Sequence, residues 1–497
     1  MRALASDSKG RLCGLCASVV HFRFPLLRTS TVFTLLALAA CGGGGDGGGT
    51  AADEIGTLAY VNTTCRDDPA GFTLTQELRV QRGDAAPITV ARFGPLGPLP
   101  AIGACTYFAS FGAGSVRSPQ IGAFQRLGVS PDGTGIVFEV SDDFNVFSQT
   151  FVPPEQEGIF VVRADGSGLR RLDRASRAAA STPNRIESNF VFSPNGRLVG
   201  FTDTGPGQPD GQDAAQIFTL DIETGQRTQV THLPPAPVGG IEGTNFEDFV
   251  DDHTILFNTS ANPDDGLNPD HIPALASIGA DGNGKPTVLP YIALPNGALV
   301  PNFAITGARR SVGAFSVPGT PVNPGPAGDT IGEVFINDDT NVLQLTDFRR
   351  TDTSFSHPLL AVDGERVFFV ASVDLGANPM QACQIFSVDA LGGDYRQLTH
   401  ITLRQLSHGG CAADQPADHC RIRFNRRSQD GRNGLLVFNS SCDPLATQVD
   451  GDQLFVMRPD GNGLRQLTNG RGVVRNVVDH SFEAELPGPW AYGPYRF

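Results

Sequence analysis

A short hairpin recurs along this chain, and it restricts the fold more than any other feature. Its clearest copy is residues 454–468, LFVMRPDGNGLRQLT, in which a Pro-Asp-Gly turn joins two short strands. Asp-Gly between apolar runs favours a hairpin, because glycine accepts a positive φ and aspartate bonds its own turn backbone. Further copies lie at 159–173, 217–231, 275–290, 334–346 and 385–399, so the hairpin returns every 53 to 69 residues.

Another strand pair precedes each hairpin, at residues 125–140, 188–202, 245–260, 302–317, 354–373 and 423–441. The repeating unit is therefore four short strands, and one such sheet cannot bury both of its faces alone. The sequence thus predicts an all-β fold, a β-propeller of four-stranded blades. Residues 57–63, 77–92 and 481–493 read as strands of one blade that both chain ends share. We expect seven blades including this shared closing blade, and six blades with irregular flanks is the alternative.

Three segments resemble known propeller repeats. SPDGTGIVF (130–138), SPNGRLVGF (193–201) and IFVVRADGSGLRRL (159–172) are similar to the PD40, or WD40-like, repeats of the TolB-like β-propeller family. The resemblance covers roughly residues 125–468 and implies a TolB-like propeller over residues 55–497. It says little about function, because the fold occurs in binding proteins and in enzymes. The α/β domain of TolB itself has no counterpart, since residues 51–124 read as strands and loops.

The N-terminus reads as a lipoprotein signal and a tether. The apolar run 31–40 is shorter than the roughly 20 residues that span a bilayer. LAAC (38–41) is similar to the lipobox of bacterial lipoproteins, which implies removal of residues 1–40 and lipid attachment at Cys41. An ordinary secretory signal with an incidental cysteine is the alternative. The glycine-rich residues 41–54 would form a flexible tether. The glycine after the lipidated cysteine resembles the outer-membrane sorting pattern, so we expect a lipid-anchored protein of the bacterial envelope, in the outer membrane and facing the periplasm.

Six cysteines lie in the body of the chain, and an even number in an exported protein favours disulfides. Sequence proximity suggests the pairs Cys65–Cys105, Cys411–Cys420 and Cys383–Cys442, although six cysteines allow fifteen pairings. The alternative is a zinc site, with His408 and His419 near Cys411 and Cys420. The body contains no CxxC pair to support zinc.

Two kinds of connection are expected in each blade. The turns within its two strand pairs are short and lie on one face of the ring, the short-turn face. The loops after its second and fourth strands lie on the other face, the long-loop face. Long loops on a rigid scaffold often bind ligands, so we expect binding there, with capping of the ring as the alternative.

Several long loops are acidic, and their carboxylates are candidate binding residues. They are Asp142, Asp143, Asp203, Asp210, Asp213, Asp264, Asp265 and Asp270. Calcium favours clustered oxygen ligands, but no loop has the spacing of a known calcium site, and solvated carboxylates are the alternative. The formal net charge of −15 disfavours nucleic acid as a partner.

The sequence contains no G-x-S-x-G and no H-E-x-x-H motif. We therefore expect a non-catalytic, protein-binding scaffold that needs no cofactor, contacts the membrane through its lipid and has envelope proteins as partners. The alternative is a carbohydrate-active enzyme like the polysaccharide lyases among TolB-like propellers, or a glycan-binding propeller. A metal-dependent lyase would use clustered histidines, whereas those of the body are scattered: His232, His253, His271, His357, His400, His408, His419 and His480.

Overall fold

The protein is described here by a computed structural model. The chain divides into two units, residues 1–48 and 49–497, and every described residue belongs to the second unit. The described residues are 56–68, 71–99, 105, 124–141, 152–176, 190–207, 211–235, 244–262, 274–289, 291–293, 299–301, 311–318, 330–337, 342–348, 358–360, 364–378, 382–401, 422–429, 435–446, 451–475 and 482–493. They form thirty β-strands, and none of them belongs to a helix long and apolar enough to cross a bilayer.

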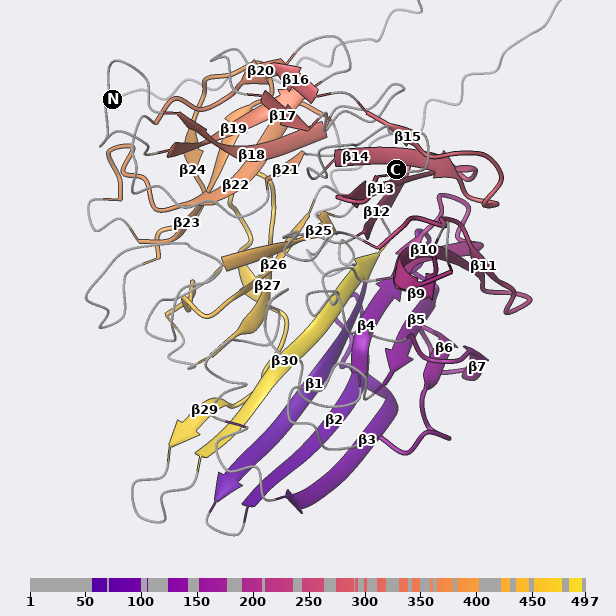
Figure 1. The fold of residues 1–497 in the computed structure, drawn as a ribbon. Helices are drawn as coiled ribbons and strands as arrows, with labels where there is room; N and C mark the ends of the chain where they lie inside the picture. Colours follow the sequence, from indigo (N-terminus) through magenta and orange to yellow (C-terminus); the bar gives the residue numbers. More distant parts are fainter. Residues whose placement is uncertain are drawn as a thin grey trace, which may run out of the picture. The chain divides into compact units, whose positions relative to one another are not determined.

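The six repeats form six small antiparallel sheets in chain order, the blades of a β-propeller (Figure 1). The first blade consists of β4 (Phe124–Val129), β5 (Gly135–Val140), β6 (Gly158–Arg163) and β7 (Arg170–Asp173). The second consists of β8 (Val191–Phe192), β9 (Leu198–Pro206), β10 (Asp213–Asp221) and β11 (Arg227–Gln229). The third consists of β12 (Asn245–Phe249), β13 (Thr254–Thr259), β14 (Ala274–Gly279) and β15 (Thr287–Val288).

The remaining blades follow the same order. A separate pair, β16 (Tyr291–Ala293) and β17 (Leu299–Pro301), precedes the fourth blade. The fourth blade has three described strands, β18 (Ser311–Pro318), β19 (Thr330–Asn337) and β20 (Val342–Gln344). The fifth consists of β21 (Leu359–Leu360), β22 (Arg366–Ala371), β23 (Gln384–Asp389) and β24 (Arg396–Gln397). The sixth consists of β25 (Ile422–Gln429), β26 (Leu436–Ser440), β27 (Gln453–Met457) and β28 (Arg465–Gln466).

A larger sheet, here called the closing sheet, joins the two ends of unit 49–497. Its order is β29-β30-β1-β2-β3, and four of its strands are twelve residues long (Figure 1). Its strands are β1 (Thr57–Asp68), β2 (Gly71–Arg82), β3 (Ile88–Leu99), β29 (Gly472–Arg475) and β30 (Phe482–Gly493). The repeats therefore form six blades, the number of the alternative, rather than the seven that we expected. The predicted pairing of the chain ends also occurs, as β1 against β30, but in a sheet longer than a blade.

Neighbouring sheets share hydrophobic clusters. Val137 and Ile159 of the first blade pack with Phe192 and Phe201 of the second. Leu58 and Tyr60 of the closing sheet pack with the sixth blade, and Ala59 and Val61, on the opposite face of β1, pack with the first. Successive residues of a strand point to opposite faces of its sheet. β1 is apolar on both faces because the closing sheet packs against the sixth blade on one side and the first blade on the other.

Paired phenylalanines recur inside the blades. In four blades the second and third strands place one Phe directly opposite another: Phe138–Phe160, Phe201–Phe218, Phe369–Phe386 and Phe438–Phe455. Their ring centroids lie 5.4 to 6.0 Å apart. Such cross-strand aromatic pairs each contribute a fraction of a kcal/mol to about 1 kcal/mol. The repeated pair therefore supports the same register in each of these blades.

Candidate functional site

Four blades carry the same side-chain clasp between their third and fourth strands. In the fifth blade the Thr399 hydroxyl donates to Gln384 Oε1 (2.8 Å) and accepts from the Ile385 amide (2.9 Å). Gln384 Nε2 in turn donates to the Ile401 carbonyl (2.7 Å), and the Ile401 amide donates to Gln384 Oε1 (2.9 Å). Equivalent clasps join Gln216–Thr231, Glu333–Thr346 and Gln453–Thr468. Third strands begin and fourth strands end at the long-loop face, so the clasps lie there.

The first blade lacks this clasp. Gly158 stands where four other blades have Gln or Glu, and Asp173 replaces their Thr. A Cβ on residue 158 would lie 2.6 Å from Arg171 Nε and 2.8 Å from the Asp173 carbonyl oxygen, so a side chain there would collide with Arg171. Arg171 Nε donates to the Asp173 carbonyl (3.2 Å), a bond that a Gln side chain makes in other blades. The exchange leaves the Asp173 carboxylate able to bond outside its own blade.

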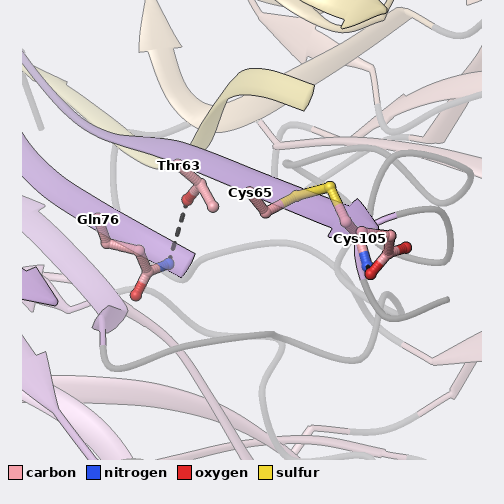
Figure 2. The surroundings of a disulfide bond; sticks show 5 residues. Thr63, Cys65, Gln76 and Cys105 are labelled. Carbon is pink, nitrogen blue, oxygen red and sulfur yellow. Dashed lines mark hydrogen bonds between the residues drawn. A yellow bond between two sulfur atoms is a disulfide. The ribbon is translucent and has the colours of Figure 1, made fainter. Parts of the chain in front are cut away.

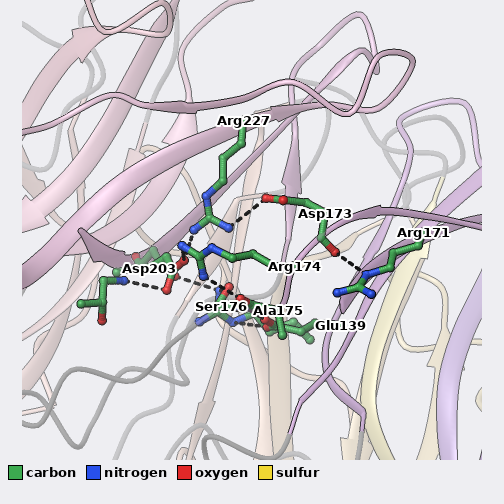
Figure 3. Close-up of polar contacts among 11 residues, drawn as sticks. Glu139, Arg171, Asp173, Arg174, Ala175, Ser176, Asp203 and Arg227 are labelled. Atoms are coloured by element: carbon green, nitrogen blue, oxygen red, sulfur yellow. Dashed lines mark hydrogen bonds and ion pairs between the residues drawn. The ribbon is translucent and has the colours of Figure 1, made fainter. Parts of the chain in front are cut away.

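That carboxylate joins a charged cluster between the first two blades (Figure 3). Arg227 of β11 donates to Asp173 Oδ2 (3.1 Å) and also to Asp203 of β9. Arg174, directly after β7, donates to Asp203 Oδ2 (3.2 Å). Figure 3 shows Arg174 and Arg227 converging on Asp203, whose side chain is fully buried, whereas that of Arg174 is 41% exposed. The cluster therefore reaches from the interior to the surface of the long-loop face.

The guanidinium of Arg227 lies over two aromatic rings, 4.3 Å from the Phe218 centroid and 5.1 Å from that of Phe201. Burial, followed by the nearby charge of Arg174, lowers the pKa of Arg227 to about 10. Arg227 thus stays cationic at neutral pH, and the aromatic rings and the two carboxylates compensate for its loss of water.

A second ion pair lies deeper at the same seam. Arg126 of β4 and Glu139 of β5 are 1% and 0% exposed, and Arg126 Nε lies 3.4 Å from Glu139 Oε2. Arg126 Nη1 donates to the Thr202 carbonyl of the second blade (2.9 Å), and Glu139 accepts from the Ser176 amide. Burial lowers the pKa of Arg126. Removing either partner would leave an uncompensated buried charge, so the pair ties the first blade to the second.

The sequence prediction for Asp203 was wrong about its setting. Asp203 lies inside strand β9 rather than in a loop, and two arginines engage its carboxylate, so it does not serve as an exposed calcium ligand. Asp213 begins β10 and is exposed. Among the described residues, no three or more His, Cys, Asp or Glu side chains lie together so that they could hold a metal ion. Six of the candidate acids lie outside the described residues: Asp142, Asp143, Asp210, Asp264, Asp265 and Asp270.

One disulfide lies at the closing sheet. Cys65 and Cys105 are bonded, the pair that their proximity suggested (Figure 2). Cys65 lies within strand β1. Asp67 Oδ1 accepts from the Cys105 amide (3.2 Å), and Gln76 of β2 donates to Thr63 of β1 (3.1 Å). The disulfide and Asp67 hold residue 105 against β1, and the Gln76–Thr63 bond joins β1 to β2 beside it.

The other cysteines are only partly described. Cys383 and Cys442 are both disulfide-bonded and belong to one hydrophobic cluster between the fifth and sixth blades. Cys411 and Cys420 lie outside the described residues, as does the lipidation candidate Cys41. The pairing among the four cysteines thus stays open, and so does the zinc alternative.

The described histidines belong to separate parts of the propeller. His232 and His400 follow the fourth strands of the second and fifth blades, where each ring contacts a Gln of that strand. His253 lies in the turn between β12 and β13. The described histidines therefore do not form one site. His271, His357, His408, His419 and His480 lie outside the described residues, so the lyase alternative stays a prediction.

Sequence reasoning missed Asp173, Arg174 and Arg227. The six hairpins themselves contained the signal, because aligning them sets Asp173 beside the threonines of four other copies and Gly158 beside their Gln or Glu. A polar clasp replaced by a carboxylate indicates a changed role for the site. The partners of Asp173 and Arg174 could be identified only from the fold, since Asp203 and Arg227 belong to the next blade.

No family model matches this chain, and no curated protein matches its sequence. Solved structures resemble its fold. One is the acylaminoacyl peptidase of Pyrococcus horikoshii, with 12% identity and a TM-score of 0.43; it is matched over 83% of this chain, which spans about half (51%) of the peptidase. Another is the oligogalacturonate lyase of Vibrio parahaemolyticus, with 11% identity, coverage of 86% and 90% of the two chains, and a TM-score of 0.40.

A protein assigned as TolB from Agrobacterium tumefaciens is 12% identical over 87% of this chain and 99% of its own, with a TM-score of 0.30. All three TM-scores lie below 0.5. The assignment of the fold therefore rests on the sheets of this chain, and these proteins lend it no function.

Proposed function

We propose that this chain is a lipid-anchored protein of the bacterial envelope that binds an envelope protein at the long-loop face and is not a catalyst. One observation carries the proposal. At the end of the first blade, Gly158 and Asp173 replace a clasp that four other blades keep, and the charged cluster formed there includes a 41% exposed Arg174. Arginine is enriched at protein interfaces, where it pairs with carboxylates of the partner.

The rigidity of the cluster supports this role. Asp203 accepts from Arg174 and from Arg227, and Arg227 is fixed between two carboxylates over two aromatic rings. A side chain that is already positioned loses less entropy on binding than a free one, so an ordered arginine makes a better anchor. The partner's chemistry that fits an exposed arginine is a carboxylate.

Cross-linking in intact envelopes, followed by mass spectrometry, tests the proposal, with the lipidated protein as bait. Recovery of a defined set of envelope proteins is the expected result. Arg174→Ala should reduce that recovery by about tenfold. Arg197→Ala is the matched control, because Arg197 is also exposed (56%) and pairs with one aspartate, Asp221, but lies at the short-turn face.

The outcomes separate the parts of the proposal. If the wild-type bait recovers only abundant envelope proteins, the scaffold function is wrong. If Arg174→Ala recovers the same set as Arg197→Ala, binding occurs but not at the charged cluster.

The anchor is tested separately by fractionation. We expect wild-type protein in the membrane fraction and Cys41→Ala protein in the soluble fraction, because the thiol that would carry the lipid is missing. A Cys41→Ala protein that still sediments with membranes would contradict lipidation at this residue.

A further inference from the structure

A pocket of about 270 Å³ opens where the closing sheet meets the sixth blade. Tyr60 of β1 and Arg79 of β2 are direct cross-strand partners, and Gln81 lies two residues along β2 on the same face. The turn between β2 and β3 and the residues around the end of β28 complete the walls. The full lining is Tyr60, Arg79, Gln81, Asp84, Ala85, Ala86, Pro87, Leu467 and Asn469.

Gln81 carries a buried acceptor with an unmet hydrogen bond. The residue is 8% exposed, and its Nε2 donates to the Gly83 carbonyl (3.2 Å). Its Oε1 is buried and has no hydrogen-bond partner among the described residues. A buried amide oxygen without a donor is unfavourable in a folded protein, so its presence in a pocket wall indicates a place where a ligand supplies that donor.

The charges around the pocket are already paired. Arg79 donates to Glu77 Oε2 through Nε (3.0 Å) and Nη2 (2.7 Å), and it also hydrogen-bonds the Tyr60 hydroxyl. Burial raises the pKa of Tyr60, which keeps its hydroxyl neutral. Asp84 pairs with Arg465 of the sixth blade. The pocket thus offers hydrogen-bonding groups without a strong net charge, and a charged ligand would find no unpaired counterion there.

Four of the lining residues are apolar. Ala85, Ala86 and Pro87 come from one turn, and Leu467 comes from the end of the sixth blade. The volume is slightly below the roughly 300–1,000 Å³ typical of pockets for drug-sized ligands, so the pocket suits a smaller molecule.

We propose that this pocket binds one uncharged sugar residue. A sugar hydroxyl supplies the donor for Gln81 Oε1, other hydroxyls bond Asp84 and Asn469, and the C–H face of the ring packs on the apolar lining residues. A neutral sugar meets every feature of the lining: donors and acceptors together, no net charge, and apolar residues. The inference is independent of the partner proposed above, because the pocket involves other elements than the charged cluster.

Saturation-transfer NMR on the full mature protein tests it, with glucose, galactose and N-acetylglucosamine as probes. We expect saturable binding of at least one sugar, weakened about tenfold by Gln81→Met, which removes the acceptor and keeps the length of the side chain. Gln229→Met in the second blade is the control, because Gln229 Nε2 donates to the Pro206 and Thr231 carbonyls in a different sheet.

Unchanged thermal unfolding of Gln81→Met would show that any loss of binding is not a loss of folding. The proposal is overturned if none of the three sugars binds the wild-type protein. It is equally overturned if Gln81→Met binds as tightly as wild type does.

Discussion

The hydroxyl of Thr399 makes two hydrogen bonds at once, donating to Gln384 Oε1 and accepting from the Ile385 amide. Valine has the same shape but neither capacity, so the position needs threonine. A second Gln, two residues before the threonine, donates to the threonine's carbonyl in four blades: Gln229, Gln344, Gln397 and Gln466. The recurring Gln-x-Thr triplet thus satisfies backbone groups where the fourth strand ends.

Thr399→Val should lower the free energy of unfolding by about 1–3 kcal/mol, because it leaves the buried Ile385 amide without an acceptor. Urea unfolding measures the change. Thr228→Val in β11 is the control, since Thr228 is only partly buried and makes no clasp. Equal losses in the two variants would mean that the clasp contributes little.

The turns between third and fourth strands share one design. Asp460 accepts from the Asn462 amide (2.9 Å) and from its side chain (2.8 Å), and Asp281 makes the same contacts with Asn283. Gly461 has φ of +85°, and a Cβ there would lie 3.0 Å from the Leu398 carbonyl oxygen, so glycine lets this turn pack on the fifth blade. The Asp-Gly segments of these hairpins are therefore turns, as the sequence predicted.

These turns should make stability depend on pH. Hydrogen bonds from Asn462 and Asn283 lower the pKa of Asp460 and Asp281. The stabilisation is present above the unfolded pKa of about 3.9 and is lost as pH falls through the lower folded values. The melting temperature should thus decrease once the pH is lower than about 4. In the double variant Asp281→Asn/Asp460→Asn, which keeps an acceptor oxygen at each position, the melting temperature should decrease less steeply with falling pH. Asp213→Asn is the control for the loss of charge. An unchanged slope in the double variant would contradict this origin.

The elements differ in how far the sequence could predict them. Each hairpin is encoded within about fifteen consecutive residues, and the structure contains all six of them. Strand β29 was missed, because four residues, Gly472–Arg475, carry too short a pattern and pair only with β30. Asp203 was placed in a loop because polar residues interrupt the apolar run. Its partner Arg227 lies 24 residues away, so only the packing of strands reveals why a charge sits there.

At the largest scale, one sheet joins the two ends of unit 49–497. Trp490 and Tyr492 of β30 are buried with Leu58 and Tyr60 of β1 against the sixth blade. On its other face β1 packs with the first blade. The closing sheet therefore connects the last repeat to the first, and its hydrophobic clusters tie the repeats into one body.

Trp490→Ala should lower the free energy of unfolding by about 3–5 kcal/mol, because a large aromatic side chain that is 5% exposed would leave a cavity at this seam. Urea unfolding followed by circular dichroism measures the loss. Leu391→Ala is the control, since Leu391 is 75% exposed and its truncation should change stability by less than about 0.5 kcal/mol. A similar stability of both variants would show that the seam does not limit the stability of the propeller.

The pairing of β1 with β30 also sets an order of events during synthesis. The Gly56 amide donates to the Tyr492 hydroxyl, a contact between residues 436 positions apart. Ribosomes make the N-terminus first, so β1 can pair with β2 early, but its second neighbour, β30, exists only after almost the whole chain has been made. Until then one edge and an apolar face of β1 are exposed to other chains. Each repeat between them pairs its strands locally, but the pairing that joins the two ends forms last, so a chain that lacks its final strand keeps that edge of β1 unpaired.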